Sequence, residues 1–324
     1  MEYVHWLSQA TLRNPIVIAA FTGWNDAGDA ASSGVRHLIE DLGATALAEI
    51  DPEEFTDFAT IRPHVRLSAG LTRNIVWPTV GMWHASTPGA DIILVLGPEP
   101  AMRWRTFSDQ IIGVARKFDA SMVITLGALL ADVPHSRTVQ LIGTATEQDL
   151  IERYDLQRSR YEGPTGIVGI VQDACQRADI PCVALWAAVP AYASQVPSPK
   201  ATLALVDRLG SIIGSTLPAA RLTAQVGDYE AQVSSIVNED DDLAGYVRRL
   251  ESMSDAGIED FSLDDDDDID DVDDDVDDDA EDDGDEDGDD DSIGGELGSN
   301  IPTLPEHVDG PAFIDEVERF LRDQ

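Results

Sequence analysis

The chain has 324 residues, enough for one large folded domain or for one domain with a smaller addition. Hydrophobic residues make up 43% of it, which suffices for a sizeable core. It carries 62 Asp and Glu against 21 Lys and Arg, a formal net charge of -41. Nucleic-acid phosphates and anionic membrane surfaces repel such an anion, so the charge argues against both as partners.

Two cysteines, Cys175 and Cys182, are too few for a disulfide-stabilised secreted scaffold, and neither has further metal ligands at a recognisable spacing. We interpret them as reduced, buried thiols. The N-terminal residues lack the basic segment of a signal peptide, and no run approaches the ~18 apolar residues that a membrane span needs. We therefore expect a cytoplasmic protein that does not associate with a membrane and does not bind a metal ion.

Short apolar runs alternate with longer amphipathic ones along the first two thirds of the chain. Residues 15–21 are apolar on both faces, which predicts a buried strand, and the apolar spacing from Ala31 to Leu42 predicts a helix that ends at Gly43. Further elements follow in chain order: a strand over 44–50, a hairpin at the sheet margin over 64–77, a strand over 91–97, a helix over 103–118, a strand over 121–126, an extended piece over 139–144, a helix over 166–178, a strand over 182–187 and a helix over 201–213. This alternation indicates an α/β fold of three layers, a mostly parallel sheet flanked by helices, over residues 1–217.

The remaining third of the chain divides into three predicted parts. Apolar residues three and four apart predict a helical hairpin over 218–256, interrupted near residues 238–242. Residues 257–300 contain the acidic run 264–291, with 22 acids and no base, and should form a disordered linker because they bury too little apolar surface. Residues 301–324 carry an apolar stripe from Phe313 to Leu321, which predicts a detached amphipathic helix.

Polar residues follow several of the predicted strands. Ligands of an open parallel sheet bind beyond the carboxyl ends of its strands, so we expect these side chains to meet in one cleft. His135 could act there as a general base, and Asp26 or Glu99 could orient it. The ligand-binding candidates are Trp24, Asn25, Arg103, Arg105, Asp132 and Arg137, of which Arg105 or Arg137 could clamp an anion.

The same residues can instead have purely structural roles. Asp26 can cap the following helix, and Arg–carboxylate pairs can hold loops together. No dinucleotide or P-loop glycine motif, no serine elbow and no His-Glu-x-x-His zinc motif is present, so no cofactor is predicted. Gly163–Gly166 precede a helix, and their amides could receive an anion.

Several motifs resemble a known family. They are Phe21-Thr22-Gly23-Trp24-Asn25-Asp26-Ala27-Gly28, Ile50-Asp51-Pro52-Glu53-Glu54-Phe55 with Arg62-Pro63, Gly97-Pro98-Glu99-Pro100 with Arg103-Trp104-Arg105, residues 126–137, Ser198-Pro199-Lys200-Ala201-Thr202, Tyr246-Val247 with Leu250-Glu251, and residues 318–322. In this order they resemble the bacterial branch of the proteasome assembly chaperone family, named for its second eukaryotic chaperone. Only the acidic insert lies outside the likeness.

The resemblance implies a three-layer α/β core similar to nucleoside phosphorylases and peptidyl hydrolases, usually assembled as a homo-oligomer, with a trimer among the possibilities. For eukaryotic and archaeal relatives it implies a non-enzymatic role in proteasome assembly, whereas the role of the bacterial branch is largely unassigned. Ala191 stands where close relatives would have a histidine, which weakens a two-histidine site.

These observations favour a homo-oligomeric, assembly-chaperone-like scaffold whose acidic tether and terminal helix engage the body or a protein partner. The alternative is a small-molecule hydrolase or phosphorylase that acts on a nucleoside or an amide in the strand-end cleft. A third hypothesis has the acidic run mimic a nucleic acid and capture basic proteins.

Overall fold

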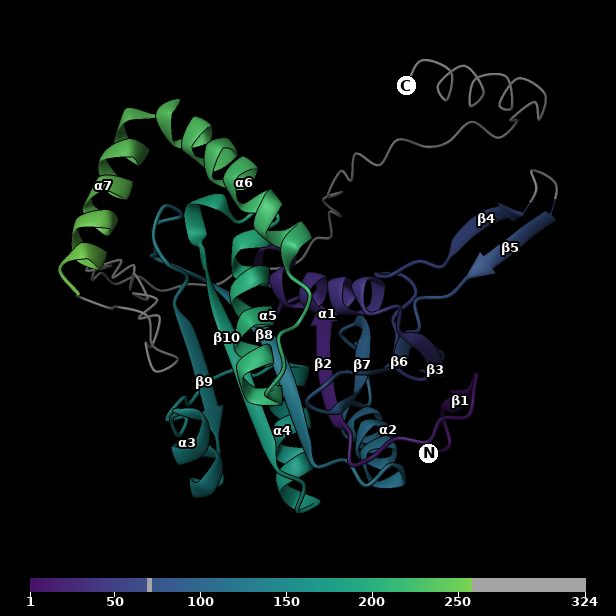
Figure 1. The fold of residues 1–324 in the computed structure, drawn as a ribbon. Coiled ribbons are helices and arrows are strands. Elements are labelled where there is room, and N and C mark those ends of the chain that lie inside the picture. Colours follow the sequence, from purple (N-terminus) through teal and green to yellow (C-terminus); the bar gives the residue numbers. More distant parts are fainter. Residues whose placement is uncertain (69–71, 258–324) are drawn as a thin grey trace, which may run out of the picture. The chain divides into compact units, whose positions relative to one another are not determined.

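Eight strands form one sheet in the order β1-β3-β6-β7-β2-β8-β10-β9, and two more form a separate ribbon, in a computed structural model that describes residues 1–68 and 72–257 (Figure 1). The sheet strands are β1 (Val4–Trp6), β2 (Ile16–Thr22), β3 (Thr45–Ile50), β6 (Val80–Ser86), β7 (Asp91–Pro98), β8 (Met122–Ala131), β9 (Leu141–Ala145) and β10 (Cys182–Pro190). The ribbon consists of β4 (His64–Ser68) and β5 (Thr72–Val76). The α-helices of the described residues are α1 (Ala30–Asp41), α2 (Trp104–Lys117), α3 (Gln148–Tyr154), α4 (Ile167–Arg177), α5 (Pro199–Ile213), α6 (Ala220–Asn238) and α7 (Asp241–Asp255).

The centre of the sheet is parallel and its margins are antiparallel. β7, β2, β8 and β10 are parallel neighbours, whereas β6, β3 and β1 on one side and β9 on the other pair antiparallel. The parallel strands are apolar on both faces because helices cover both. This confirms the predicted α/β fold with a mostly, but not purely, parallel sheet.

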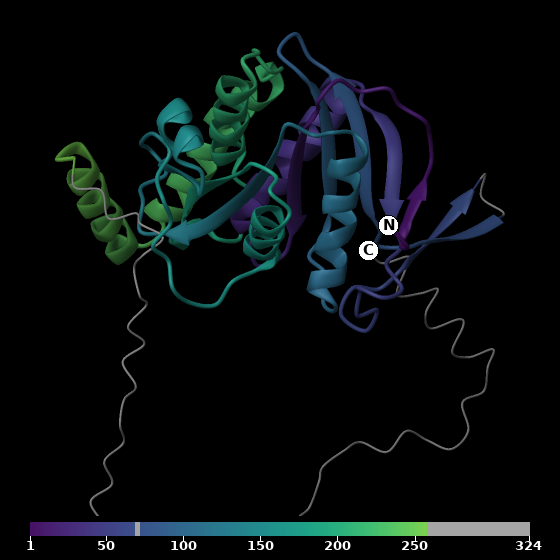
Figure 2. The same cartoon turned by 90° about the horizontal axis from the view of Figure 1, so that it is seen from below.

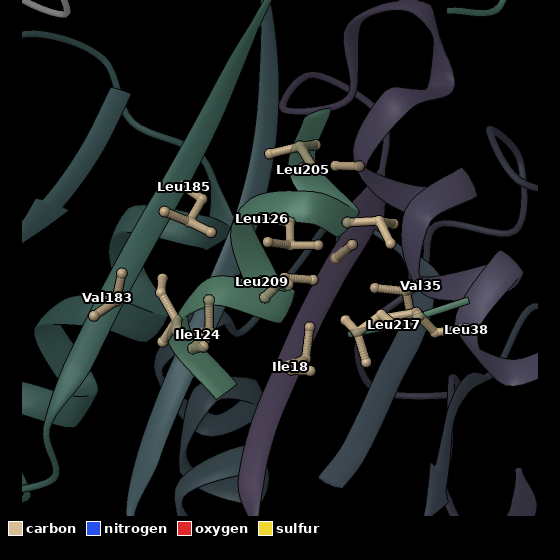
Figure 3. Close-up of a cluster of buried hydrophobic side chains, with 14 of the residues drawn as sticks. Ile18, Val35, Leu38, Ile124, Leu126, Val183, Leu185, Leu205, Leu209 and Leu217 are labelled. Carbon is tan, nitrogen blue, oxygen red and sulfur yellow. The ribbon is translucent and has the colours of Figure 1, made fainter. Parts of the chain in front are cut away.

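Helices cover the two faces of the sheet in two separate layers (Figure 2). α1 and α5 pack on one face, where side chains such as Ile18, Leu126 and Leu209 form a continuous apolar cluster (Figure 3). α2 and α4 pack on the other face over Val17, Val95 and their neighbours. Burial of apolar surface contributes about 25 cal/mol per Å² to stability, so the helices packed on both faces stabilise the sheet.

The two helices predicted after residue 217 are present as α6 and α7. Val233, Val237 and Val247 are buried and pack with Ala193 and Val196, which follow β10. The Asp240 carboxylate accepts hydrogen bonds from the amides of Asp242 and Leu243 and so caps α7. None of the helices in the described residues is long and apolar enough to cross a membrane.

Some element boundaries differ from the prediction for physical reasons. β8 continues to Ala131 because it pairs with β10 from Val123 to its end, although small residues such as Gly127 and Ala128 indicated an earlier end. The 64–77 hairpin is not part of the main sheet margin but a ribbon of its own. β1, β6 and α3 were not predicted, and the acidic linker and terminal helix lie outside the described residues.

Candidate functional site

The carboxyl ends of the parallel strands form a stepped rim. β2 and β7 end together, since Thr22 and Pro98 are register partners. β8 and β10 run on to Ala131 and Pro190, three residues beyond the level at which Ala128 pairs with Asp26. At ~3.3 Å per residue, these two strands end roughly 10 Å further out. We call the two levels the lower step and the upper step.

On the lower step, Glu99 is bonded to the start of a helix. Its Oε1 atom accepts a hydrogen bond from the amide of Ile167, at the N-terminus of α4, at 2.8 Å. The same oxygen accepts another from Nδ2 of the buried Asn25 at 2.8 Å. A Cβ atom on Gly166 would collide with the Asn25 amide, so only glycine allows this close approach. An anionic group from within the chain, Glu99, therefore lies at the start of α4, next to the residues 163–166 whose amides could have received an anion.

Asp26, also on the lower step, holds the start of a second helix. Its Oδ1 atom accepts hydrogen bonds from the amides of Ala31 at 2.8 Å and Ser32 at 3.0 Å, in the first turn of α1. Burial raises the pKa of the Asp26 carboxyl above its ordinary value, and the hydrogen bonds from Ser32 and Ala31 oppose that shift. This is the helix-capping role that the sequence offered as the alternative to catalysis.

On the upper step, His135 is enclosed by hydroxyl groups. The Tyr192 hydroxyl accepts a hydrogen bond from the His135 amide at 2.7 Å and lies 2.8 Å from its Nδ1, while Nε2 lies 2.9 Å from Oγ of Ser234 on α6. The simplest assignment has the Tyr192 hydroxyl donate to Nδ1 and the Nε2–H donate to Ser234, which requires a neutral imidazole. Burial lowers the pKa of His135, and Lys200 adds to the effect against the opposing charges of Glu251 and Glu230.

The loop around His135 is tied to three helices. Lys200 on α5 donates from Nζ to the His135 carbonyl at 2.7 Å and to Glu230 on α6 at 2.6 Å. Arg137 makes a two-pronged ion pair with Asp255 on α7, at 2.7 and 2.9 Å. Ser136 donates a hydrogen bond to Glu251 on the same helix. These contacts anchor α6 and α7 to the ends of β8 and β10.

The other predicted residues lie apart from these two networks or at their margin. Arg103 pairs with Glu54 and lies over the Tyr3 ring, with its guanidinium carbon 5.5 Å from the ring centroid. Arg105 is exposed and forms no ion pair with any described residue. Asp132 faces the Tyr246 hydroxyl, and burial, with Asp132 as a second cause, raises the pKa of Tyr246 to about 12.

The space beside His135 leaves little room for a small molecule. The space beside His135 measures about 10 Å³, comparable to one water. A larger cleft of about 690 Å³ lies along β9 and the end of α7, and Arg137 is the one predicted site residue in its lining. Among residues 1–68 and 72–257, no hydrogen bond or ion pair joins His135 to Asp26 or Glu99, and no three potential metal ligands cluster. Trp24 is 65% exposed on the lower step.

Sequence reasoning missed the partners that complete these networks. Tyr192 follows β10 directly, so the strand-end rule that selected His135 also points to it. Ser198 accepts a hydrogen bond from the Ala201 amide at the start of α5 and carries the usual signature of a helix cap. Ser234 and Glu230 lie in the middle of a helix, and no local pattern indicates them.

Comparison with known proteins identifies the family to which this chain belongs. The model of the PAC2 family matches residues 20–237, which include β7, β8 and β10, the carboxyl end of β2, both steps of the rim and most of α6. The chain belongs to the PAC2 family. This confirms the family resemblance found in the sequence motifs.

Solved structures agree with this assignment. A PAC2 family protein from Streptomyces avermitilis is 43% identical, with a TM-score of 0.67, and the match covers 72% of this chain and 99% of that one. A proteasome-assembly chaperone homologue from Mycobacterium tuberculosis is 45% identical over the same shares of both chains, with a TM-score of 0.66. PbaB of Pyrococcus furiosus, an archaeal proteasome activator, is 15% identical and shares the fold at a TM-score of 0.60, covering 72% of this chain and 97% of PbaB. No curated protein matches the chain.

The Tyr192 hydroxyl should stabilise this PAC2 protein. Tyr192→Phe leaves the His135 amide and ring without their partner, and we expect the free energy of unfolding to fall by about 1–3 kcal/mol. Urea titration followed by circular dichroism measures the change. Tyr161→Phe is the matched control, because its hydroxyl bonds the Pro164 carbonyl at an exposed position and should matter by less than about 0.5 kcal/mol. Equal effects of the two substitutions would contradict the proposed role of the His135 network.

The stability should also depend on the protonation of His135. Its folded-state pKa lies below the unfolded value of about 6.5, so between these two values the unfolded chain binds more protons and stability falls as pH falls. The loss should level off below the folded-state pKa. Urea titrations of the wild type and of His135→Gln between about pH 5 and pH 7.5 isolate this contribution, since the other histidines are common to both. Identical pH slopes would contradict a neutral, buried His135.

Proposed function

We propose that this PAC2 protein is a self-associating interaction scaffold that assists the assembly of a larger protein complex in the cytoplasm. The observation that carries the proposal is that the candidate catalytic groups of the rim are already engaged in structural contacts. The polar groups that could serve catalysis are bonded to helix N-termini and to neighbouring side chains. Binding at such a rim would use its outer surface rather than a cavity.

The outer surface of the rim suits a protein partner. Trp24 is 65% exposed, Met102 46% and Leu130 47%, each at or just after the carboxyl end of a parallel strand. Exposed tryptophans at a rigid position are frequent energetic centres of protein interfaces. The likeness to a proteasome-assembly chaperone homologue supports a proteasome subunit as the partner class. The proposal includes a contribution to this contact from residues 257–300 and 301–324.

Reconstitution of proteasome particles from separate Mycobacterium tuberculosis subunits tests this function. We expect the full chain to raise the yield of assembled particles and Trp24→Ala to lower that gain at least threefold, because the indole would anchor the contact. Leu7→Ala is the control, since Leu7 is 56% exposed after β1, away from the strand-end rim.

Two outcomes would contradict the proposal. One is an assembly yield that the wild-type chain leaves unchanged, with no binding to any subunit. The other is turnover of nucleosides or short amides by the wild type that His135→Gln abolishes, which would assign the rim to the hydrolase or phosphorylase alternative.

A further inference from the structure

The β4–β5 ribbon presents an apolar face that the described residues leave uncovered. The register pairs Val65 with Ile75 and Leu67 with Arg73, so these four side chains share one face of the ribbon. Val65 is 50% exposed, Leu67 61% and Ile75 52%. Trp77 continues the same face, packs its ring against Phe58 at 5.1 Å and is still 46% exposed. We call β4, β5 and Trp77 the arm.

An arm of this kind needs a partner surface. A two-stranded ribbon is only marginally stable in water, and contiguous exposed apolar side chains mark interaction surfaces. The main sheet does not supply the cover, because the arm forms a separate sheet that projects beyond β3 and β6 (Figures 1 and 2).

The charge of the arm selects the chemistry of its partner. Residues 61–77 contain Arg62, His64, Arg66 and Arg73 and no Asp or Glu, in a chain whose formal net charge is -41. The partner surface should therefore combine exposed apolar groups with a cluster of carboxylates.

Such a surface exists at the other end of the same domain. The connection from α6 to α7 and the first residues of α7 carry four consecutive exposed acids, Glu239 to Asp242, next to Ile236, which is 38% exposed. We call residues 236–242 the acidic turn. Both views place the arm beside the β3 and β6 margin and the α6–α7 pair on the side of β10 and β9 (Figures 1 and 2). An arm therefore meets the acidic turn of another copy rather than its own.

We propose that the arm of one copy docks on the acidic turn of a second copy. Because the two surfaces differ, the contact is head-to-tail and repeats from copy to copy, closing into a ring where the rotation allows. The apolar face of the arm supplies the buried area, Arg73 on that face pairs with the carboxylates, and Arg66 on the opposite face adds to the positive charge of the arm. This inference rests on the self-association proposed above and identifies its interface.

Charge reversal on the full chain tests the contact. The arm variant carries Arg66→Glu and Arg73→Glu, and the turn variant carries Glu239→Lys, Asp241→Lys and Asp242→Lys. Asp240 is left intact because it caps α7. Each variant alone brings like charges together, so sedimentation should give the mass of a single 35.0 kDa chain where the wild type gives a multiple of it. An equimolar mixture restores opposite charges at every contact between unlike variants and should recover species that contain both variants.

The control carries Arg158→Glu and Arg160→Glu, two exposed arginines outside the arm, and should keep the wild-type mass. Melting curves followed by circular dichroism show whether each variant folds. The interface is overturned if a folded variant keeps the wild-type mass, if the mixture stays at the mass of one chain, or if deletion of residues 264–291 alone abolishes association. A wild type that sediments as a single chain at every concentration would overturn self-association itself, which separates the two failures.

Discussion

The structure depends on how the helices that start at the carboxyl end of the parallel strands are stabilised. Each such helix exposes unpaired amides at the same end of the sheet, and these amides need acceptors where the backbone is buried. Asp26 supplies the acceptor for α1, Glu99 for α4 and Ser198 for α5. The same rim is where an α/β enzyme would place its catalytic groups, so capping and catalysis compete for the same residues.

In this protein capping occupies the lower step, and docking of α6 and α7 occupies the upper one. His135 has both ring nitrogens facing hydroxyl groups and its carbonyl facing Lys200, while a space of about 10 Å³ remains beside it. Exposed apolar groups remain on the outside, on the rim at Trp24 and on the arm. This distribution favours contacts with proteins over chemistry on small molecules, in agreement with the proposed function.

Much of the fold could be predicted because its strands and helices carry clear periodicity. Residues 15–21 and 91–97 are apolar on both faces, as strands buried between two layers must be. β6 was not predicted because Gly81 and His84 interrupt its apolar run. Its place in the sheet also depends on pairing with its antiparallel neighbours β3 and β7. The candidate site residues were chosen because they follow strand ends, but the sequence did not reveal that they divide into two separate networks. This division depends on β8 running past β2 and on Ser234, 99 residues from His135, which no local pattern reveals.

The claim that Glu99 caps a helix rather than serves a reaction can be measured most directly by a double-mutant cycle. Urea titration gives the unfolding free energies of Asn25→Ala, Glu99→Ala and the double variant, with Glu54→Ala, at an exposed ion pair, as the control. We predict that Glu99→Ala lowers the unfolding free energy by about 1–3 kcal/mol and that the pair is coupled by about 1 kcal/mol. Unchanged or increased stability in Glu99→Ala, as expected when a strained catalytic group is removed, would contradict the account.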